Sequence, residues 1–121
     1  MSKKLKNHKD LDVWKNSMDL VTDVYKVTTE FPTEERYGLS QQLRRSAVSI
    51  PSNIAEGAGR KSKKEFVRFL SIALGSLAEC ETQLLIATKL QYIDNIADLD
   101  EKILSIKRMI NGLINYLDKK L

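Results

Sequence analysis

The sequence predicts an all-α fold, an antiparallel up-down-up-down bundle of four helices. Apolar residues recur at alternating steps of three and four along most of the chain, which is the spacing of one helix face. The 121 residues include only two prolines and five glycines, too few to separate many short strands. The segments between the periodic stretches are short, and short loops make neighbouring helices antiparallel.

The length and composition are those of one globular domain. Residues 1–9 form a basic N-terminal tail, and residues 10–121 form the expected bundle domain. The tail has no apolar run behind it, so a signal peptide is not expected. No stretch approaches the ~18 consecutive apolar residues of a membrane span. We therefore expect a cytoplasmic protein that makes no membrane contact.

The first helix is expected over residues 10–29, and it carries two apolar stripes. One stripe consists of Leu11, Trp14, Met18, Val21 and Tyr25. The other, about a third of a turn away, consists of Val13, Leu20, Val24 and Val27. A helix with two such stripes is covered on two sides, which favours an oligomer over a lone monomer.

The second helix is expected to start with Thr33 as its N-cap. Two glutamates follow in its first turn, where their negative charge interacts favourably with the positive end of the helix dipole. Pro51 interrupts the apolar pattern, and a proline inside a helix costs ~3 kcal/mol and normally bends the axis. Because Ile54 continues the pattern, we expect one helix that is kinked at Pro51 and stops at Gly57 and Gly59.

Ser62 opens the third helix with a capping box, since Glu65 stands three residues after it. Apolar core positions then continue as far as Ala87. Asp98, with Glu101 at the same spacing, is the expected start of the fourth helix. The fourth helix has the most regular heptad pattern of the chain.

The positive charge of the chain is concentrated in one segment. Residues 32–68 carry eight Lys/Arg and four Asp/Glu, whereas residues 1–31 have a net charge of +1 and residues 69–121 a net charge of −1. The turn before the third helix combines lysines and arginines with the amides of a helix N-terminus, which favours an anion. The candidate nucleic-acid-binding residues are Arg44, Arg45, Arg60, Lys61, Lys63, Lys64 and Arg68.

Two structural alternatives remain for these residues. The turn can be a solvated basic turn without any specific ligand. Arg44 and Arg45 can instead form ion pairs across the bundle. A turn centred near Lys61 would place residue 45 opposite residue 77, which brings both arginines within reach of Glu79 or Glu81.

The residues offer no support for catalytic or metal chemistry. The only histidine, His8, lies in the basic tail, and the only cysteine, Cys80, lies in an apolar-periodic stretch. A carboxylate-bridged di-metal site would need inward glutamates together with Glu-x-x-His pairs. Glu79 and Glu81 are better explained by ion pairs than by a bound cation. We therefore expect no enzyme activity, no metal, no cofactor and no small-molecule substrate.

Six short motifs carry a resemblance that spans nearly the whole chain. They are RYGL at 36–39, QLRR at 42–45, SIPSNIAEG at 49–57, FLSIA at 69–73, GS at 75–76 and ECETQL at 79–84. In these motifs the chain resembles the bacterial four-helix-bundle proteins named for intervening sequences in the 23S ribosomal RNA gene. Cys80 replaces an aliphatic residue of the family pattern.

This resemblance implies a ring-like homo-oligomer of four-helix bundles, with a pentamer as the expected assembly. The chain is also similar to the accessory bundle protein of diversity-generating retroelements, and that similarity implies nucleic-acid binding by a basic pentamer. The family's name describes a gene location, and its molecular function is unassigned.

Two functions are consistent with these observations. The first is a non-catalytic oligomeric bundle that binds the RNA or DNA backbone through a basic surface, with steep salt dependence. For this function we expect no exposed aromatic platform on which bases stack, and hence no strong sequence readout. The alternative is a protein-interaction or scaffold module that has no nucleic-acid role and binds its own copies or another protein.

Overall fold

The computed structural model describes residues 7–120, and these residues contain helices and no strands. The predicted all-α, four-helix fold is thereby confirmed. Residues 1–6 of the expected tail lie outside the described residues. The helices are α1 (Asp12–Thr29), α2 (Leu39–Ala58), α3 (Lys63–Lys89) and α4 (Ala97–Asp118), with short 3-10 turns at His8–Asp10 and Thr33–Glu35.

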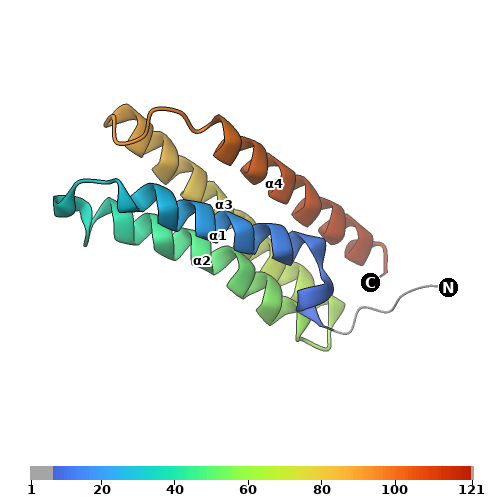
Figure 1. The fold of residues 1–121 in the computed structure, drawn as a ribbon. Helices are drawn as coiled ribbons and strands as arrows, with labels where there is room; N and C mark the ends of the chain where they lie inside the picture. The colour runs from blue at the N-terminus through green and yellow to red at the C-terminus, as the bar shows by residue number, and fades with distance from the viewer. Residues whose placement is uncertain (1–6, 121) are drawn as a thin grey trace.

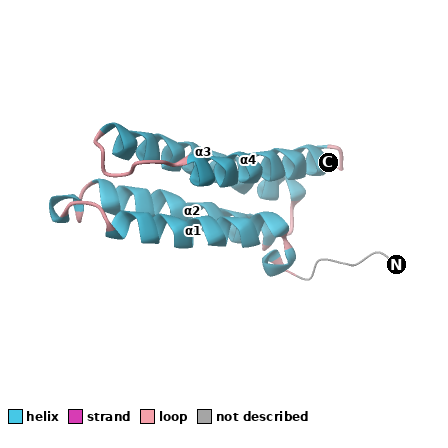
Figure 2. Cartoon of the chain, turned by 45° about the horizontal axis from the view of Figure 1, so that its top comes forward, coloured by secondary structure: helices cyan, strands magenta, loops and turns pink. Residues whose placement is uncertain are grey.

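Successive helices run in opposite directions along the bundle (Figure 1). They lie in two layers, α1 beside α2 and α3 beside α4 (Figure 2). Each helix packs against the helices before and after it, and α4 returns to pack against α1. The α2–α3 turn therefore lies at one end of the bundle, and the α1–α2 and α3–α4 connections lie together at the other end (Figure 1).

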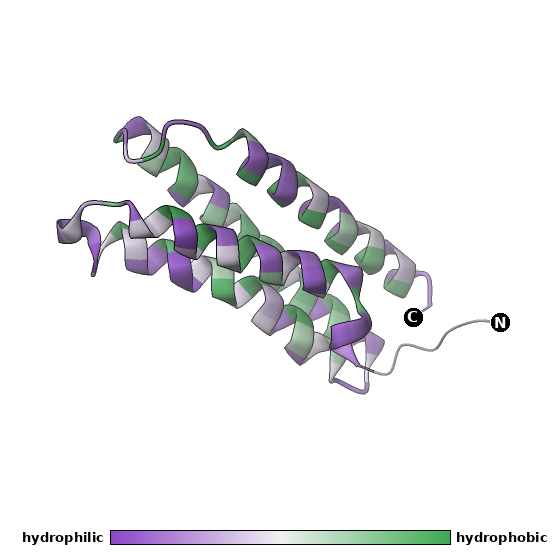
Figure 3. Cartoon of the chain, in the orientation of Figure 1, coloured by the Kyte–Doolittle hydropathy of each residue, from purple (hydrophilic) through white to green (hydrophobic). Residues whose placement is uncertain are grey.

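The core is a single apolar cluster to which all four helices contribute. Hydrophobic and hydrophilic residues alternate around each helix, as amphipathic packing requires (Figure 3). The fully buried large side chains include Leu20, Leu43, Ile50, Ile54, Leu70, Leu77, Leu84, Ile106 and Ile110.

On α1 the buried stripe is the second of the two predicted stripes. Val13, Leu20 and Val24 are buried, whereas Met18 and Tyr25 of the other stripe are exposed. Ser17 and Thr28 complete the buried stripe. Their hydroxyls can be buried because each donates to a backbone carbonyl four residues earlier, Ser17 to Val13 at 2.7 Å and Thr28 to Val24 at 2.8 Å.

The start of α2 differs from the prediction. Thr33 begins a separate 3-10 turn, and α2 begins only at Leu39, after Gly38. Thr33 is therefore not its N-cap. Glu35 Oε1 accepts a hydrogen bond from the Leu39 amide at 3.1 Å, so this carboxylate caps the helix from outside its first turn.

α2 continues without interruption past the buried Pro51. Side chains supply donors to carbonyl groups around the proline: Ser52 Oγ donates to the Val48 carbonyl at 2.8 Å, and Asn53 Nδ2 donates to the Ser49 carbonyl at 2.8 Å. The bend at Pro51 stays a prediction.

The starts of α3 and α4 are capped by different side chains. Ser62 Oγ accepts from the Glu65 amide at 3.2 Å, which confirms Ser62 as the N-cap of α3. α4 begins at Ala97, one residue before the expected Asp98. Its cap is supplied by Asn95, whose Oδ1 accepts from the Ala97 amide at 2.8 Å, because an Asx side chain can bond an amide two residues on.

The helices α2 and α3 approach closely at their shared turn. A Cβ added at Gly57 would lie 2.8 Å from Phe69 Cβ and 3.0 Å from Phe66 Cδ1. Further along, Ser46 Oγ donates to Gln83 Oε1 at 2.8 Å. Between these two points, Ser49 Oγ lies 2.8 Å from Ser76 Oγ, and together the three contacts set the register of the two helices.

Candidate nucleic-acid interface

The seven predicted basic residues do not form one continuous surface. Arg44 and Arg45 lie near the start of α2, whereas the other five surround the α2–α3 turn at the opposite end of the bundle. About 16 residues of largely helical chain separate Arg44 from Arg60, or roughly 24 Å at 1.5 Å per residue. We call the second group, Arg60, Lys61, Lys63, Lys64 and Arg68, the turn cluster.

Within the turn cluster, the two arginines are partly neutralised. Arg60 Nη2 lies 2.8 Å from Glu56 Oε2, and Arg68 Nη1 lies 3.7 Å from Glu65 Oε1. Both guanidinium groups also lie over the ring of Phe69, with their Cζ atoms 5.0 Å and 5.4 Å from its centroid. The arginines are thus held against the protein surface by a carboxylate and an aromatic face.

The three lysines of the turn cluster are in a different state. Lys61, Lys63 and Lys64 are exposed, and none of them forms an ion pair with any residue in the range 7–120. They flank the N-terminus of α3, where the helix dipole adds partial positive charge. This end of the bundle therefore offers an anion three uncompensated ammonium groups.

Arg44 faces α1, and its predicted ion pair with Glu79 or Glu81 is wrong. Its Nε donates to Thr28 Oγ1 at 2.7 Å, and its Cζ lies 4.5 Å from the centroid of the Tyr25 ring. Arg44 follows the buried Leu43 by about 100° around the helix, which directs it toward α1 and away from α3.

The predicted ion pair of Arg45 is wrong as well. Arg45, Glu79 and Glu81 are all exposed, and no ion pair links them within the described chain. The physical reason is rotation: Ser46, the next residue of α2, faces α3 and bonds Gln83, whereas Arg45 lies on the exposed side of the helix.

Around Arg44 and Arg45 the structure forms a surface pocket of about 600 Å³, which we call the Arg–Tyr pocket. Two of its residues are exposed aromatics: Tyr37 is 80% exposed and Tyr25 is 43% exposed. The expectation of no exposed aromatic platform is therefore wrong. The pocket is lined by Tyr25, Arg36, Tyr37, Gln41, Arg44, Arg45, Val48 and Ser49.

The predicted set of basic residues does not include Arg36, Tyr37 or Tyr25, which line this pocket. The helix pattern places Tyr25 in an apolar stripe, and the other two residues stand in the RYGL motif. The available signal was an arginine–tyrosine pair directly before Gly38, at a turn where neither side chain can enter a helix core.

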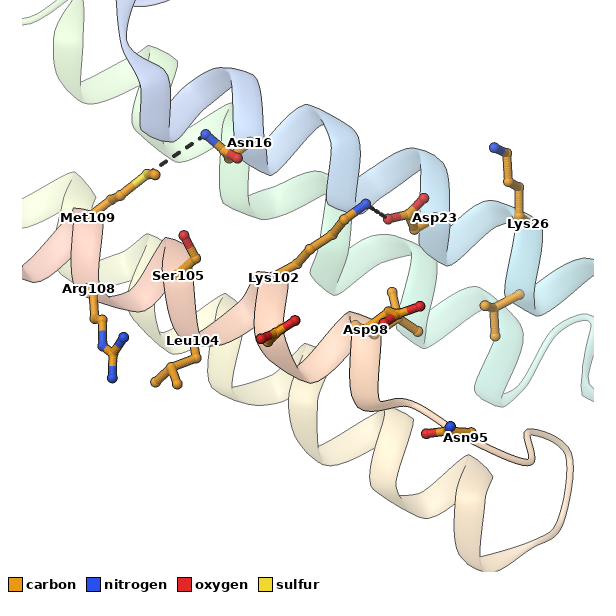
Figure 4. A pocket seen from close by; sticks show the side chains of 13 residues that line it. Asn16, Asp23, Lys26, Asn95, Asp98, Lys102, Leu104, Ser105, Arg108 and Met109 are labelled. Atoms are coloured by element: carbon orange, nitrogen blue, oxygen red, sulfur yellow. Dashed lines mark hydrogen bonds and ion pairs between the residues drawn. The ribbon is translucent and has the colours of Figure 1, made fainter.

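A second, larger pocket of about 950 Å³ lies between α1 and α4 (Figure 4). Lys102 reaches across it from α4 to the carboxylate of Asp23 on α1, and Asn16 Nδ2 lies 3.9 Å from Met109 Sδ. Three acidic and three basic side chains line this groove, so its charge selects neither an anion nor a cation.

The described residues hold no group of three or more His, Cys, Asp or Glu side chains that could bind a metal ion. Cys80 is fully buried, and this burial raises the pKa of its thiol to about 11. A thiol in that environment is protonated and shielded, so it is unsuited to act as a nucleophile.

By length and composition alone, α3 could cross a membrane, and it is the one helix within residues 7–120 with this property. The core helix of a bundle meets the same criterion, and Leu70, Leu77 and Leu84 of α3 are buried in the core. However, only 33% of its most apolar window is buried within this chain. α3 therefore presents apolar side chains outward as well as inward.

Comparison with known proteins identifies the family. Residues 9–112 match the 23S rRNA-intervening sequence protein family. The chain belongs to this family. No curated protein matches the chain. Among solved structures, the chain is similar to a protein of unknown function from the S23 ribosomal protein family of Bacteroides thetaiotaomicron VPI-5482.

That similarity has 26% sequence identity and a TM-score of 0.61, and it covers 87% of this chain and 94% of the other. The two chains therefore share the fold over most of their lengths. The function of that protein is unknown, so the chemistry of the two basic sites has to be argued from their geometry.

Proposed function

We propose that this protein is a non-catalytic helical bundle that binds the phosphate backbone of RNA or DNA through the turn cluster. The observation that carries the proposal is the group of three exposed, unpaired lysines around the N-terminus of α3. Phosphates favour such a position because the ammonium groups and the helix dipole attract the same charge.

The test compares two triple variants in binding titrations with RNA and with duplex DNA over a series of salt concentrations. Changing Lys61, Lys63 and Lys64 to Gln should weaken binding and reduce the slope of log K against log[salt] by about 2 to 3, since each duplex phosphate contact contributes about 0.9. The control variant removes equal charge from exposed positions on and after α4, through Lys107→Gln, Lys119→Gln and Lys120→Gln.

The control should bind like the wild type. Equal losses in both triple variants would show that only net charge matters, and would remove the turn cluster as the site. If the wild type binds neither RNA nor DNA at low salt, the function itself is wrong.

A second proposed function, self-assembly, rests on the outer side of α3. Ile72, Ile86 and Leu90 are 41%, 42% and 49% exposed, and their spacing places them in one stripe about a third of a turn from the core stripe. A stripe of large apolar side chains on a surface is typical of a protein interface. We propose that copies of this chain associate through the stripe, and the family resemblance supports a ring of five.

Sedimentation analysis tests the assembly. The double variant Ile72→Glu and Ile86→Glu should sediment as a monomer, because a carboxylate in an apolar interface is costly to desolvate. Leu104→Glu is the matched control, since Leu104 is similarly exposed but lies on α4. A wild-type monomer at all concentrations would contradict the proposal.

A further inference from the structure

The Arg–Tyr pocket has a composition that the turn cluster lacks. Three guanidinium groups and two exposed aromatic rings line one pocket, and no carboxylate is among its lining residues. Arg36, Arg44 and Arg45 form no ion pair in the part of the chain that the structure describes. The pocket therefore offers both positive charge and flat aromatic surface to a ligand.

Arg44 is held in place before any ligand arrives. Its Nε donates to Thr28 Oγ1 at 2.7 Å, its Nη2 lies 3.5 Å from the Tyr25 carbonyl oxygen, and its guanidinium group lies over the Tyr25 ring. A side chain fixed in this way loses little conformational entropy on binding. Arg44 can thus present its remaining N–H groups to a phosphate at low entropic cost.

Tyr37 is the most exposed large hydrophobic side chain of the described residues, at 80%. It lies in the turn before α2, with the Cζ atom of Arg36 5.6 Å from its ring centroid. The other aromatic of the pocket, Tyr25, lies under Arg44. Tyr37 therefore supplies the free aromatic face of the pocket.

A ligand that satisfies the whole pocket needs a flat apolar face and flanking negative charge. Unpaired nucleobases linked by phosphates have both properties, and bases stack on aromatic side chains and on guanidinium planes. In a duplex the bases stack on one another and their faces are not available. The pocket volume of about 600 Å³ lies within the range of small-ligand sites.

We propose that the Arg–Tyr pocket binds single-stranded nucleic acid, with one unpaired base stacked on Tyr37 and the neighbouring phosphates bound by Arg36, Arg44 and Arg45. This inference rests on the proposed nucleic-acid function and adds a preference for single strands over duplexes. The turn cluster, at the other end of α2, binds backbone phosphates of either form.

The experiment measures binding of three fluorescent probes by anisotropy: a short oligoadenylate, the same oligomer with abasic sites in its centre, and a duplex of equal length. The wild type should bind the oligoadenylate about 5- to 100-fold more tightly than the abasic oligomer, the range expected for one stacked base. Parallel titrations with oligoadenylates of RNA and of DNA show which of the two nucleic acids the pocket prefers.

Tyr37→Ala should remove the preference for bases and leave duplex and abasic binding unchanged. Tyr37→Phe keeps the aromatic face and should retain the preference. Tyr116→Ala is the control, because Tyr116 is an exposed tyrosine on α4 far from the pocket residues in sequence. Circular dichroism verifies that each variant folds, which is expected for side chains this exposed.

Equal wild-type affinity for the oligoadenylate and the abasic oligomer would overturn the inference and leave the backbone function standing. Binding of polyglutamate that is lost in Tyr37→Ala would also overturn it, since the pocket would then serve an acidic protein partner. Failure to bind any nucleic acid would end both proposals together.

Discussion

Tyr92 and Glu35 lie 57 residues apart in sequence and are joined by a hydrogen bond of 2.8 Å from Tyr92 Oη to Glu35 Oε2. The other oxygen of the same carboxylate accepts from the Leu39 amide at 3.1 Å. The ring of Tyr92 also packs against Phe31, with centroids 5.4 Å apart. One carboxylate thus connects the α1–α2 segment, the start of α2 and the α3–α4 segment, at the end of the bundle that carries the Arg–Tyr pocket.

This relationship predicts an acid-sensitive contribution to stability. The hydrogen bond from Leu39, followed by that from Tyr92, lowers the pKa of Glu35 below its ordinary value of 4.5. The ionised Glu35 carboxylate therefore stabilises the folded protein above pH 4.5, and this stabilisation is lost as the pH falls through the lowered pKa of Glu35 in the folded protein. In urea unfolding, the wild type should exceed Glu35→Gln in stability at neutral pH, and this difference should shrink on acidification. A difference that is independent of pH would contradict the prediction.

The same contact predicts an alkaline limit. The hydrogen bond to Glu35 raises the pKa of Tyr92 above its ordinary value of 10.0. The protonated Tyr92 hydroxyl therefore contributes its full stabilisation below pH 10.0, and this stabilisation is lost as the pH rises through the raised pKa of Tyr92. Tyr92→Phe, which has no phenolic proton, should lose less stability than the wild type over that range. Tyr116→Phe, outside this contact, should follow the wild type.

Replacing Gly57 in α2 by alanine is predicted to lower the stability of the protein, although alanine has the higher helix propensity. The added methyl group of Gly57→Ala would meet Phe69 and Phe66 at 3.0 Å or less, so we expect a loss of about 1–3 kcal/mol from overpacking. Gly112 on α4 has no heavy atom within 4 Å of its added Cβ. Gly112→Ala should therefore stabilise the protein by about 0.5–1 kcal/mol. Urea unfolding at matched protein concentration measures both, and an equal effect would refute the assigned role of Gly57.

Gln91, two residues after the end of α3, has a backbone conformation that favours glycine. Its φ is +65°, and the amide of Tyr92 donates to the Ala87 carbonyl at 2.9 Å, as in a Schellman motif. Gln91→Gly should stabilise the protein by about 0.5–1 kcal/mol, because it removes the steric cost of a left-handed residue with a Cβ atom. Gln91→Ala keeps that cost and should show no gain. Thermal or urea unfolding separates the two.

Cys80 is predicted to be inert in the folded protein. It is fully buried, and burial raises the pKa of its thiol to about 11. Its reaction with a thiol reagent at mildly alkaline pH should be slow in buffer and fast in urea, because the thiolate forms only after unfolding. Cys80 is the only cysteine, so the reagent reports on one site. Rapid modification without urea would show that the α2–α3 packing opens readily.

The sequence was informative wherever the signal is local. The helix pattern, the Ser62 cap and the location of the basic segment all follow from residues within a few positions of one another. Thr33 and Asp98 were wrong as helix starts for the opposite reason. Other side chains supply the caps: Glu35 accepts from the Leu39 amide and Asn95 from the Ala97 amide, and only the folded backbone shows which acceptor lies within reach of which amide.

The sequence by itself determined the fold class and the basic character of residues 32–68, because periodicity and charge are properties of the chain. Only the tertiary structure decided which charges face which partners. Arg44 lies on Tyr25 and away from the glutamates of α3, and Tyr37 is exposed beside it. These outcomes depend on the rotation and register of α2 against α3. The close approach at Gly57 and the Ser46–Gln83 contact set both. A shift of one helical turn would give the side chains of α2 different partners.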